Sequence, residues 1–393
     1  MNLKEADKMY IGNTFRRYDA VFKKGNGAYL TDVKGRKYID MLAGVAVNLL
    51  GYNDADVNRA AIGQIKKYIH TSNLFYSPYQ VKLAELILRN TGGSKVYFAN
   101  TGAEASEIAF KIARKWGILH KRGAYKVVSM YNSFHGRTIA ALAATGQKKF
   151  HKYLKPLPPG FIHARFNDIK DAAAKIDSKT AAVFVEPVQA EGGVNIPEKN
   201  YLEKLKALCA RKNVLLMIDE VQTGLGRTGR FLASAYSGVK PDIITLGKGL
   251  GGGFPLSAVV VSKRLEKVFT YGDHGTTMGG NHVACAAGYA AMKKISTEKM
   301  LKSVREKGRM LLGGLKNIKS PLIKEARGMG MIVGLELSKP LAGALAAEAF
   351  KKRLIINACR ENVIRIVPPL IIGKKEIGRA VKIIEEALKG MEG

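Results

Sequence analysis

Residues 242–253 read Asp242-Ile243-Ile244-Thr245-Leu246-Gly247-Lys248-Gly249-Leu250-Gly251-Gly252-Gly253, an apolar run that leads into a glycine-rich loop with a lysine at the junction. A second apolar run ends at Asp219, and Lys248 follows Asp219 by 29 residues (248 − 219). A lysine in such a loop can form a Schiff base with an aldehyde cofactor, and an aspartate at the end of a strand can keep a pyridinium nitrogen protonated. The two residues therefore predict pyridoxal phosphate (PLP) chemistry, with Lys248 and Asp219 as its catalytic groups.

The pattern of apolar residues around these positions predicts an α/β fold. Five short apolar runs have the length of strands and are bounded by polar or glycine residues. They span residues 126–130, 182–185, 214–218, 243–246 and 258–261. Apolar residues with helical spacing lie between them, as in the face from Ala105 to Trp116. This alternation predicts a mainly parallel sheet between layers of helices, with the ligand beyond the carboxyl ends of the strands.

The length of 393 residues favours two unequal domains that share a site. After about residue 281 the chain is rich in helix-like segments and lysine, and it then becomes strand-like at 332–335 and 363–367. We therefore expect a large PLP-binding domain at residues 51–280 and a small α+β domain at residues 281–393. We expect the N-terminal segment, residues 1–50, to pack with the small domain.

The composition predicts a soluble cytoplasmic protein without a membrane span. No stretch approaches the ~18 consecutive apolar residues of a membrane helix, and the charged N-terminus lacks the apolar run of a secretory signal. The cysteines are Cys209, Cys285 and Cys359, an odd number without the spacing of a metal site. This pattern argues against a disulfide framework and against a bound metal, and it favours a reducing compartment.

The chain is strongly basic, because 64 Lys and Arg against 32 Asp and Glu give a formal net charge of +32. Such a charge attracts acidic partners, including nucleic acid. The basic residues are spread along the chain, and the run that interleaves cations with aromatics, at residues 148–153, matches no nucleic-acid motif. We interpret the charge as a solvated surface, with an acidic carrier protein as the alternative and no specific nucleic acid.

A candidate for binding the cofactor phosphate follows the apolar run 96–98, where Asn100-Thr101-Gly102-Ala103-Glu104 opens a helix-like segment. Thr101 offers a hydroxyl, Gly102 lets the backbone approach closely, and the first free N–H groups of a helix face an anion along the helix dipole. The same residues also fit an ordinary helix start, with Thr101 as the N-cap and Glu104 as its partner in a capping box. The Lys248–Asp219 pair favours the phosphate site.

The longest motif reads Leu215-Leu216-Met217-Ile218-Asp219-Glu220-Val221-Gln222-Thr223-Gly224-Leu225-Gly226-Arg227-Thr228-Gly229 and is followed by the Lys248 segment. It resembles the motif of class III, fold type I, PLP-dependent aminotransferases, and the resemblance covers essentially the whole chain. In length and motif detail the chain is most similar to the acetylornithine aminotransferases of this family. The resemblance implies the type I transferase fold.

The resemblance also implies roles for the residues that match the family's motifs. Lys248 resembles the lysine that holds the cofactor and shuttles the proton, and Asp219 resembles the partner of the pyridinium nitrogen. The other matching cofactor positions are Gly102 and Ala103 at the phosphate, Phe134 and Val221 at the ring, and Gln222 near the phenolic oxygen.

Two arginines match the family's carboxylate-binding positions. Arg137 resembles a clamp whose fork takes a carboxylate through two hydrogen bonds, although a surface ion pair is the alternative. Glu191 matches the glutamate that pairs with a second arginine, which is Arg365 here. The resemblance implies that Glu191 neutralises Arg365 when the basic donor is bound. With glutamate, it moves aside so that Arg365 takes the α-carboxylate while Arg137 takes the other.

The segment 274–281 resembles one that crosses a dimer interface in the family. The resemblance implies that Thr277 caps the cofactor phosphate of the partner subunit and that Thr276 lies near the substrate. We therefore expect a homodimer with two shared sites.

The reaction that the resemblance implies is transfer of the δ-amino group of N2-acetylornithine to 2-oxoglutarate, in arginine biosynthesis, with N-acetylglutamate 5-semialdehyde and glutamate as products. Residues 44–48 have no tyrosine where ornithine aminotransferases tend to carry one, which favours an N-acylated donor. One alternative is a lysine-pathway aminotransferase for N-substituted or carrier-linked substrates, and another is an ornithine or 4-aminobutyrate aminotransferase. A basic polyanion-binding protein without catalysis is the alternative from another class.

Overall fold

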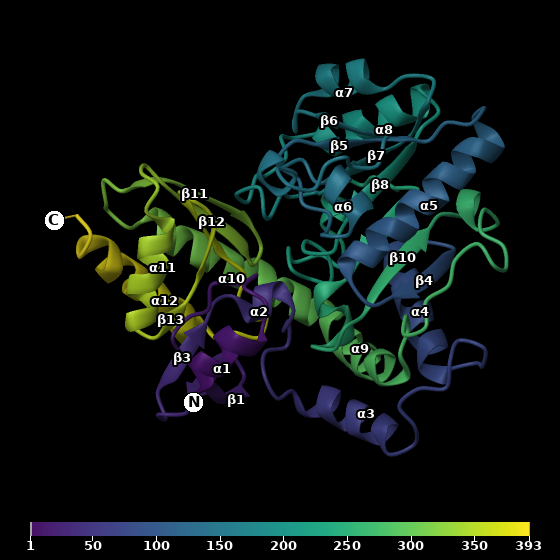
Figure 1. Cartoon of the computed structure of the whole chain (residues 1–393). Coiled ribbons are helices and arrows are strands. Elements are labelled where there is room, and N and C mark those ends of the chain that lie inside the picture. The colour runs from purple at the N-terminus through teal and green to yellow at the C-terminus, as the bar shows by residue number, and fades with distance from the viewer. Residues whose placement is uncertain (1, 393) are drawn as a thin grey trace.

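The computed structural model describes residues 2–392, which form a seven-stranded sheet and two four-stranded sheets (Figure 1). The helices are α1 (Leu3–Tyr10), α2 (Ala43–Ala46), α3 (Ala55–Ile65), α4 (Pro78–Thr91), α5 (Gly102–His120), α6 (Ile139–Ala144), α7 (Ile169–Lys175), α8 (Tyr201–Arg211), α9 (His282–Ile295), α10 (Glu298–Lys316), α11 (Ala342–Lys351) and α12 (Lys374–Lys389). The short 3-10 helices are η1 (Lys148–Phe150), η2 (Ala233–Tyr236), η3 (Lys248–Gly251) and η4 (Lys263–Leu265).

The strands are β1 (Phe22–Asn26), β2 (Tyr29–Asp32), β3 (Lys37–Asp40), β4 (Lys95–Ala99), β5 (Lys126–Met130), β6 (Phe161–Ala164), β7 (Thr180–Val185), β8 (Leu215–Asp219), β9 (Ile243–Leu246), β10 (Ser257–Val261), β11 (Ile323–Met329), β12 (Ile332–Leu337), β13 (Leu354–Ile355), β14 (Asn357–Arg360) and β15 (Val363–Ile366). The seven-stranded sheet has the order β4-β10-β9-β8-β7-β5-β6. The five predicted strands all lie in it, at or within two residues of the predicted bounds.

The prediction of a mainly parallel sheet is confirmed, with one exception. Strand β10 runs antiparallel to both of its neighbours, β9 and β4. The connection from β9 to β10 spans residues 247–256, which is too short for the crossover that a parallel partner needs, so the chain turns straight back. Strand β6 was not predicted, because this half-buried edge strand is short and its apolar residues are interrupted by His163.

Both faces of the large sheet are covered by helices, as predicted. Along β7, Ala182 and Phe184 pack in the cluster that contains the buried face of α5. Val183 and Val185 point the other way and pack with residues of α7 and α8. This alternation follows from the two-residue repeat of a strand, and it explains why the strand is apolar on both sides.

The N-terminal segment and the C-terminal part of the chain share a sheet. Strand β3 pairs in parallel with β13, so that Ile39 lies opposite Leu354, and Figure 1 shows the purple N-terminal strands beside α11 and α12. The other small sheet, β11-β12-β15-β14, is antiparallel and packs against α10 and α11. Helix α9 packs on α3 and α4. The predicted domain limits near residues 50 and 280 stay a prediction.

None of the helices in the part of the chain that the structure describes is long and apolar enough to cross a membrane.

Candidate active site

The edge of the large sheet brings Asp219 and Lys248 together. Asp219 is the last residue of β8, and Lys248 begins η3 just after β9 ends. Strands β8 and β9 are parallel neighbours, with Asp219 opposite Thr245, so both residues leave the sheet at the same carboxyl edge. Lys248 has φ 47°, in the left-handed region. Such a conformation is uncommon for a residue with a side chain, and strained residues of this kind cluster at functional sites.

The surroundings of the Lys248 amine favour its neutral form. Burial lowers the pKa of Lys248 to about 8, and the charge of Arg365 adds to this effect. The carboxylates of Glu191, Asp219 and Glu186 oppose it only in part. An amine with this pKa can take up and release a proton near neutral pH, as a general base and acid must.

The carboxylate of Asp219 is fixed by neighbours on both oxygens. Oδ1 accepts hydrogen bonds from the backbone N–H of Val221 (3.0 Å) and from Thr245 Oγ1 (3.1 Å), and Oδ2 lies 2.7 Å from His135 Nδ1. The His135 ring stacks on Phe184, with 4.1 Å between the ring centroids. A carboxylate offers about four acceptor positions. Within residues 2–392 Asp219 therefore keeps capacity for one further donor, such as a protonated ring nitrogen.

Glu186 lies beside Asp219 and orders the segment that carries Phe134. The backbone N–H of Phe134 donates to Glu186 Oε2 at 3.1 Å. Burial, and then the charge of Asp219, raise the pKa of Glu186 well above its ordinary value. The raised pKa favours the protonated form of Glu186, which accepts the hydrogen bond from Phe134.

The start of α5 has the N-cap that the sequence predicted. The backbone N–H of Glu104 donates to Thr101 Oγ1 at 3.2 Å, so Thr101 is the N-cap. The expected capping box is shifted by one residue, because the Glu104 carboxylate accepts from the backbone N–H of Asn100 (2.9 Å) rather than from that of Thr101. The backbone amides of Gly102 and Ala103 open the helix, where free N–H groups attract an anion.

The start of α5 lies directly against the Lys248 and Asp219 segments. A Cβ added to Gly102 would lie 2.8 Å from Val221 Cγ1, which a real side chain could not tolerate. A Cβ added to Gly247 would lie 3.2 Å from Val221 Cγ1 and 3.6 Å from Gly102 Cα. The predicted phosphate end, the predicted ring contact Val221 and the lysine segment therefore form one continuous surface.

Glu191 and Arg365 are brought together, as predicted from the resemblance. Glu191 Oε1 forms an ion pair with Arg365 Nη1, and Arg365 Nη2 donates to Asn357 Oδ1 at 2.9 Å. Gln222 Oε1 accepts from Arg365 Nη1 (3.0 Å), and Gln222 Nε2 donates to Glu191 Oε1 (3.3 Å). Burial alone would raise the pKa of Glu191, but Arg365 and Lys248 lower it overall. Arg365 is only 2% exposed, so this buried arginine depends on its partners.

Arg137 stands at the site on an aromatic support that the sequence did not reveal. Its guanidinium carbon lies 3.9 Å from the ring centroid of Phe150 and 5.5 Å from that of Phe134. Phe150 belongs to the run 148–153, which was interpreted as a solvated surface. A cation over an aromatic face is attracted by the ring, so Phe150 keeps the exposed Arg137 side chain in place.

The two threonines of the 274–281 segment lie differently. Thr276 Oγ1 accepts from the backbone N–H of Gly279 (3.1 Å) and lies 3.4 Å from Asn100 Nδ2, next to the start of α5. Thr277 is exposed. His135, Thr245, Phe150 and Asn357 are contacts that sequence reasoning missed. Of these, Thr245 lies inside the segment 242–253 that the sequence marked as functional, and His135 lies between the predicted site residues Phe134 and Arg137.

The comparisons with known proteins agree with this site. Residues 11–388 match the model of the family described as aminotransferase class III. The chain belongs to the class III aminotransferases. It is 42% identical, over 385 residues, to an acetylornithine aminotransferase of Caldanaerobacter subterraneus subsp. tengcongensis, covering 97% of this chain and 98% of the relative. An acetylornithine aminotransferase of Aquifex aeolicus is also 42% identical, over 96% of this chain and 100% of the relative.

Solved structures of class III aminotransferases share the fold. An ornithine aminotransferase from Toxoplasma gondii ME49 has a TM-score of 0.95 and 34% identity, covering 99% of this chain and 94% of that one. An N-acetylornithine aminotransferase from Stenotrophomonas maltophilia K279a has a TM-score of 0.87 and 31% identity, covering 99% of both chains. The predicted family and type of fold are confirmed.

Class III aminotransferases use PLP, and the residues of this site fit that cofactor. The site offers an amine whose pKa burial has lowered, and a buried carboxylate with an acceptor position to spare. It also offers a helix start at which Gly102 leaves no side chain between the backbone and the site. The predictions of an aminotransferase and of PLP as its cofactor are confirmed.

Proposed function

We propose that this aminotransferase transfers the δ-amino group of N2-acetylornithine to 2-oxoglutarate, in arginine biosynthesis, with N-acetylglutamate 5-semialdehyde and glutamate as products. The relatives from Caldanaerobacter and Aquifex, which are named acetylornithine aminotransferases, support this donor. The observation that carries the proposal is the Glu191–Arg365 ion pair, which Gln222 and Asn357 hold in place. A second arginine, Arg137, lies on the Phe150 ring and forms no ion pair within residues 2–392.

The residues around Lys248 divide the chemical work. When bound, PLP supplies an aldehyde that takes up the amino group and a ring that accepts electrons. Lys248 Nζ would remove the proton from the substrate carbon that bears the amine and would deliver it to the cofactor carbon that receives the amino group, a general acid–base contribution of roughly 10²–10⁴-fold. Asp219, oriented by His135, balances the positive charge of a ring nitrogen.

The remaining residues hold the cofactor in position. We propose that Phe134 and Val221 lie on the ring and that Gln222 lies near the phenolic oxygen. Thr101, Gly102 and Ala103 would bind the phosphate through the start of α5.

The arginines explain how one site accepts two different substrates. While Glu191 neutralises Arg365, the donor binds with its carboxylate on Arg137 and its distal amine at Lys248. When glutamate binds, Glu191 moves away and Arg365 takes the α-carboxylate while Arg137 takes the side-chain carboxylate. Two arginine forks suit the two carboxylates of 2-oxoglutarate and glutamate.

We also propose that the working unit is a homodimer in the cytoplasm. Thr277 is exposed, and beside its segment Leu74, Phe75 and Tyr76 are exposed as well. Asn73 joins the two segments by donating to the carbonyls of Thr276 (2.9 Å) and Gly279 (3.0 Å). Clustered exposed apolar side chains are typical of protein interfaces. Such an interface would let Thr277 reach the phosphate of the partner subunit and would bring Thr276 near the substrate. The free cysteines fit a reducing compartment.

The test is the absorption spectrum of the PLP-loaded enzyme, recorded while amines are added one at a time. The amines are N2-acetylornithine, ornithine, 4-aminobutyrate and an amine linked to an acidic carrier protein. We expect N2-acetylornithine to bleach the cofactor band at the lowest concentration. If another amine bleaches it better, the enzyme class stands and the proposed donor is wrong.

A further inference from the structure

Glu191 lies on a short loop, residues 189–195, whose conformation is strained. The loop is closed at its base by two backbone hydrogen bonds of 3.1 Å between Gln189 and Asn195. Inside the loop, Val194 has φ 55° and a fully buried side chain. A β-branched residue is rare in the left-handed region and persists there only where its surroundings hold it.

The surroundings that hold this loop come from the sheet on the other side of the site. Three consecutive carbonyls of the loop accept hydrogen bonds from two arginines of that sheet. Arg360 Nε donates to Gly192 O (3.2 Å), Arg327 Nη2 to Gly193 O (2.6 Å), and Arg327 Nε to Val194 O (3.1 Å). We call Arg327 and Arg360 the arginine clamp.

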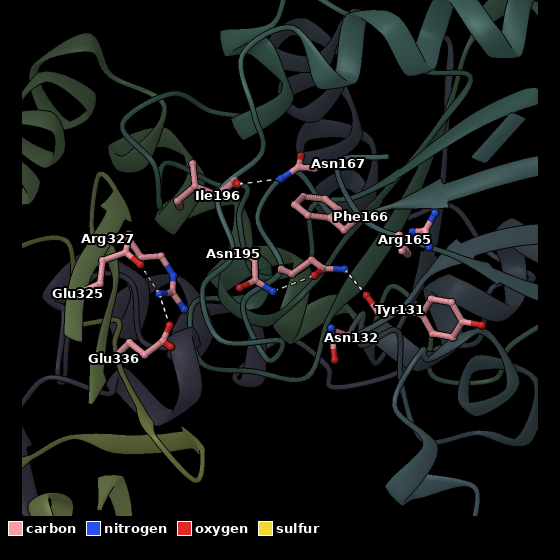
Figure 2. A pocket seen from close by; sticks show the side chains of 11 residues that line it. Tyr131, Asn132, Arg165, Phe166, Asn167, Asn195, Ile196, Glu325, Arg327 and Glu336 are labelled. Carbon is pink, nitrogen blue, oxygen red and sulfur yellow. Dashed lines mark hydrogen bonds and ion pairs between the residues drawn. The ribbon is translucent and has the colours of Figure 1, made fainter. Parts of the chain in front are cut away.

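The clamp is itself anchored and is not a pair of free surface cations. Arg327 Nη1 donates to Glu325 Oε2 (2.9 Å) and Glu336 Oε2 (2.5 Å), as Figure 2 shows, and Arg327 is largely shielded from solvent. Arg360 Nη2 donates to Asn132 Oδ1 at 2.7 Å. Hydrogen bonds to charged donors are stronger than neutral ones, so the clamp fixes the loop firmly.

The clamp and Arg365 lie in the same small sheet. Arg327 on β11 is opposite Gly334 on β12, and Gly334 is opposite Arg365 on β15. A Cβ added to Gly334 would lie 2.9 Å from Val194 Cβ, so the strained loop packs directly onto β12 between Arg327 and Arg365. One sheet therefore positions both members of the Glu191–Arg365 pair: it carries Arg365 directly and holds Glu191 through its loop.

One side of the loop faces a cleft. A cleft of about 550 Å³ separates the large sheet from β11 and β12 there, and Gln189, Asn195 and Ile196 form part of its wall (Figure 2). Arg327, Glu325 and Glu336 line the same cleft from β11 and β12, so the hydrogen bonds of Arg327 join the loop to that wall.

We propose that Arg327 and Arg360 are positioning residues for Glu191 and thereby set the preference between the N-acylated donor and glutamate. They hold the loop where Glu191 pairs with Arg365, the state that suits the donor. This inference rests on the proposed function of the Glu191–Arg365 pair. Loosening the clamp favours the state in which Glu191 has left Arg365, which is the state that glutamate needs.

The experiment compares kcat/KM for the two half-reactions, with N2-acetylornithine and with glutamate, in the PLP-loaded enzyme. For Arg327→Gln and Arg360→Gln we expect the donor value to fall by about tenfold while the glutamate value is kept or rises, since each change removes charged hydrogen bonds to the loop. Arg327→Lys restores part of the donor value, because one cationic donor remains. Arg165→Gln is the matched control, as Arg165 lines the opposite wall of the cleft and pairs with Asp168.

Amide hydrogen exchange of residues 189–195, measured on the same variants, reports the loop directly. We expect faster exchange at Asn195 in Arg327→Gln and no change in Arg165→Gln. If exchange and the ratio of the two half-reactions both stay at wild-type values, the clamp has no positioning role. If both half-reactions fall equally, the arginines are merely structural and the inference is likewise wrong.

Glu191→Ala separates this inference from the proposed function. If Glu191→Ala leaves the ratio of the half-reactions unchanged, the switch itself is wrong and the inference is wrong with it. If Glu191→Ala shifts the ratio but Arg327→Gln does not, only the clamp is wrong. In the double variant we expect Arg327→Gln to add nothing to the ratio of Glu191→Ala, because both changes act through one contact.

Discussion

Lys248 and Glu186 share one buried environment that drives both side chains toward their neutral forms. Burial lowers the pKa of the Lys248 amine and raises that of the Glu186 carboxyl, because water no longer stabilises either charge. The neighbouring Asp219 carboxylate has hydrogen-bonding partners on both of its oxygens.

Glu186→Gln tests the neutral state of this carboxyl. Above the ordinary glutamate pKa of about 4.3, the unfolded chain has released the proton that folded Glu186 still holds. Stability therefore falls as the pH rises from there to the raised pKa of the folded protein. Glutamine keeps the acceptor for Phe134 and removes this dependence. We expect the variant to gain thermal stability over wild type at pH 8 and much less at pH 5, measured by calorimetry. Glu198→Gln, at an exposed glutamate, is the control. Equal gains in stability at both pH values, or the same pH-dependent gain in Glu198→Gln, would contradict a raised pKa for Glu186.

Phe150→Ala tests the aromatic support of Arg137. An exposed cation–π contact is worth about 0.5–1 kcal/mol, so we expect KM to rise about two- to fivefold for both N2-acetylornithine and glutamate, with kcat unchanged. Both substrates are affected because, in the proposed function, both place a carboxylate on Arg137. Tyr153→Ala, which removes an exposed aromatic stacked with Lys152 three residues along, is the control. A change in only one substrate's KM would show that Arg137 does not serve both.

At the scale of elements, the start of α5 meets the segments that carry Asp219 and Lys248 without room for a side chain. Gly102→Ala would press a methyl group against Val221 and displace the first turn of the helix. We expect PLP to bind about tenfold more weakly, measured by equilibrium dialysis, with the fold kept. Gly63→Ala is the control, because the space around Gly63 in α3 is open and alanine there should stabilise the helix by about 0.5–1 kcal/mol. Unchanged PLP affinity in Gly102→Ala would remove α5 from the phosphate site.

The central elements were predictable because their own residues specify them. Strands β7 and β8 consist almost entirely of apolar residues, and the buried face of α5 repeats with helical spacing. The direction of β10 was not predictable from its composition, since an antiparallel strand buried on both faces is as apolar as a parallel one. Strand β6 is held by pairing with β5, an interaction that a short, interrupted run does not reveal.

The same division holds for the site. Lys248, Asp219 and Glu191 lie in motifs with a distinctive order along the chain. Phe150 lies in a run that was interpreted as solvated surface. Arg327 and Arg360 bind a loop that is more than 130 residues away in the sequence. Single-sequence reasoning has no means to find a contact between residues 327 and 193, because the contact exists only once two sheets face each other.

At the scale of the whole molecule, the net charge of +32 acts on charged substrates before they reach the site. A dianion such as 2-oxoglutarate is attracted, whereas N2-acetylornithine has no net charge. We expect kcat/KM for 2-oxoglutarate to fall by about tenfold between low and high salt, as long-range attraction is screened. N2-acetylornithine, with a much weaker dependence, is the internal control. Equal salt dependence for the two substrates in steady-state assays would locate the effect in the site and not in the overall charge.

The antiparallel strand β10 has a consequence for how such an enzyme changes over time. Because β9, β10 and β4 are direct neighbours, Lys248 and the start of α5 are joined through three adjacent strands of one sheet. Arg365 stands on a separate sheet. The large sheet therefore carries Lys248, and the small sheet carries an arginine that, in the proposed function, helps select the substrate. During evolution, substitutions in the small sheet can change the preferred amine while Lys248 and Asp219 on the large sheet stay unchanged.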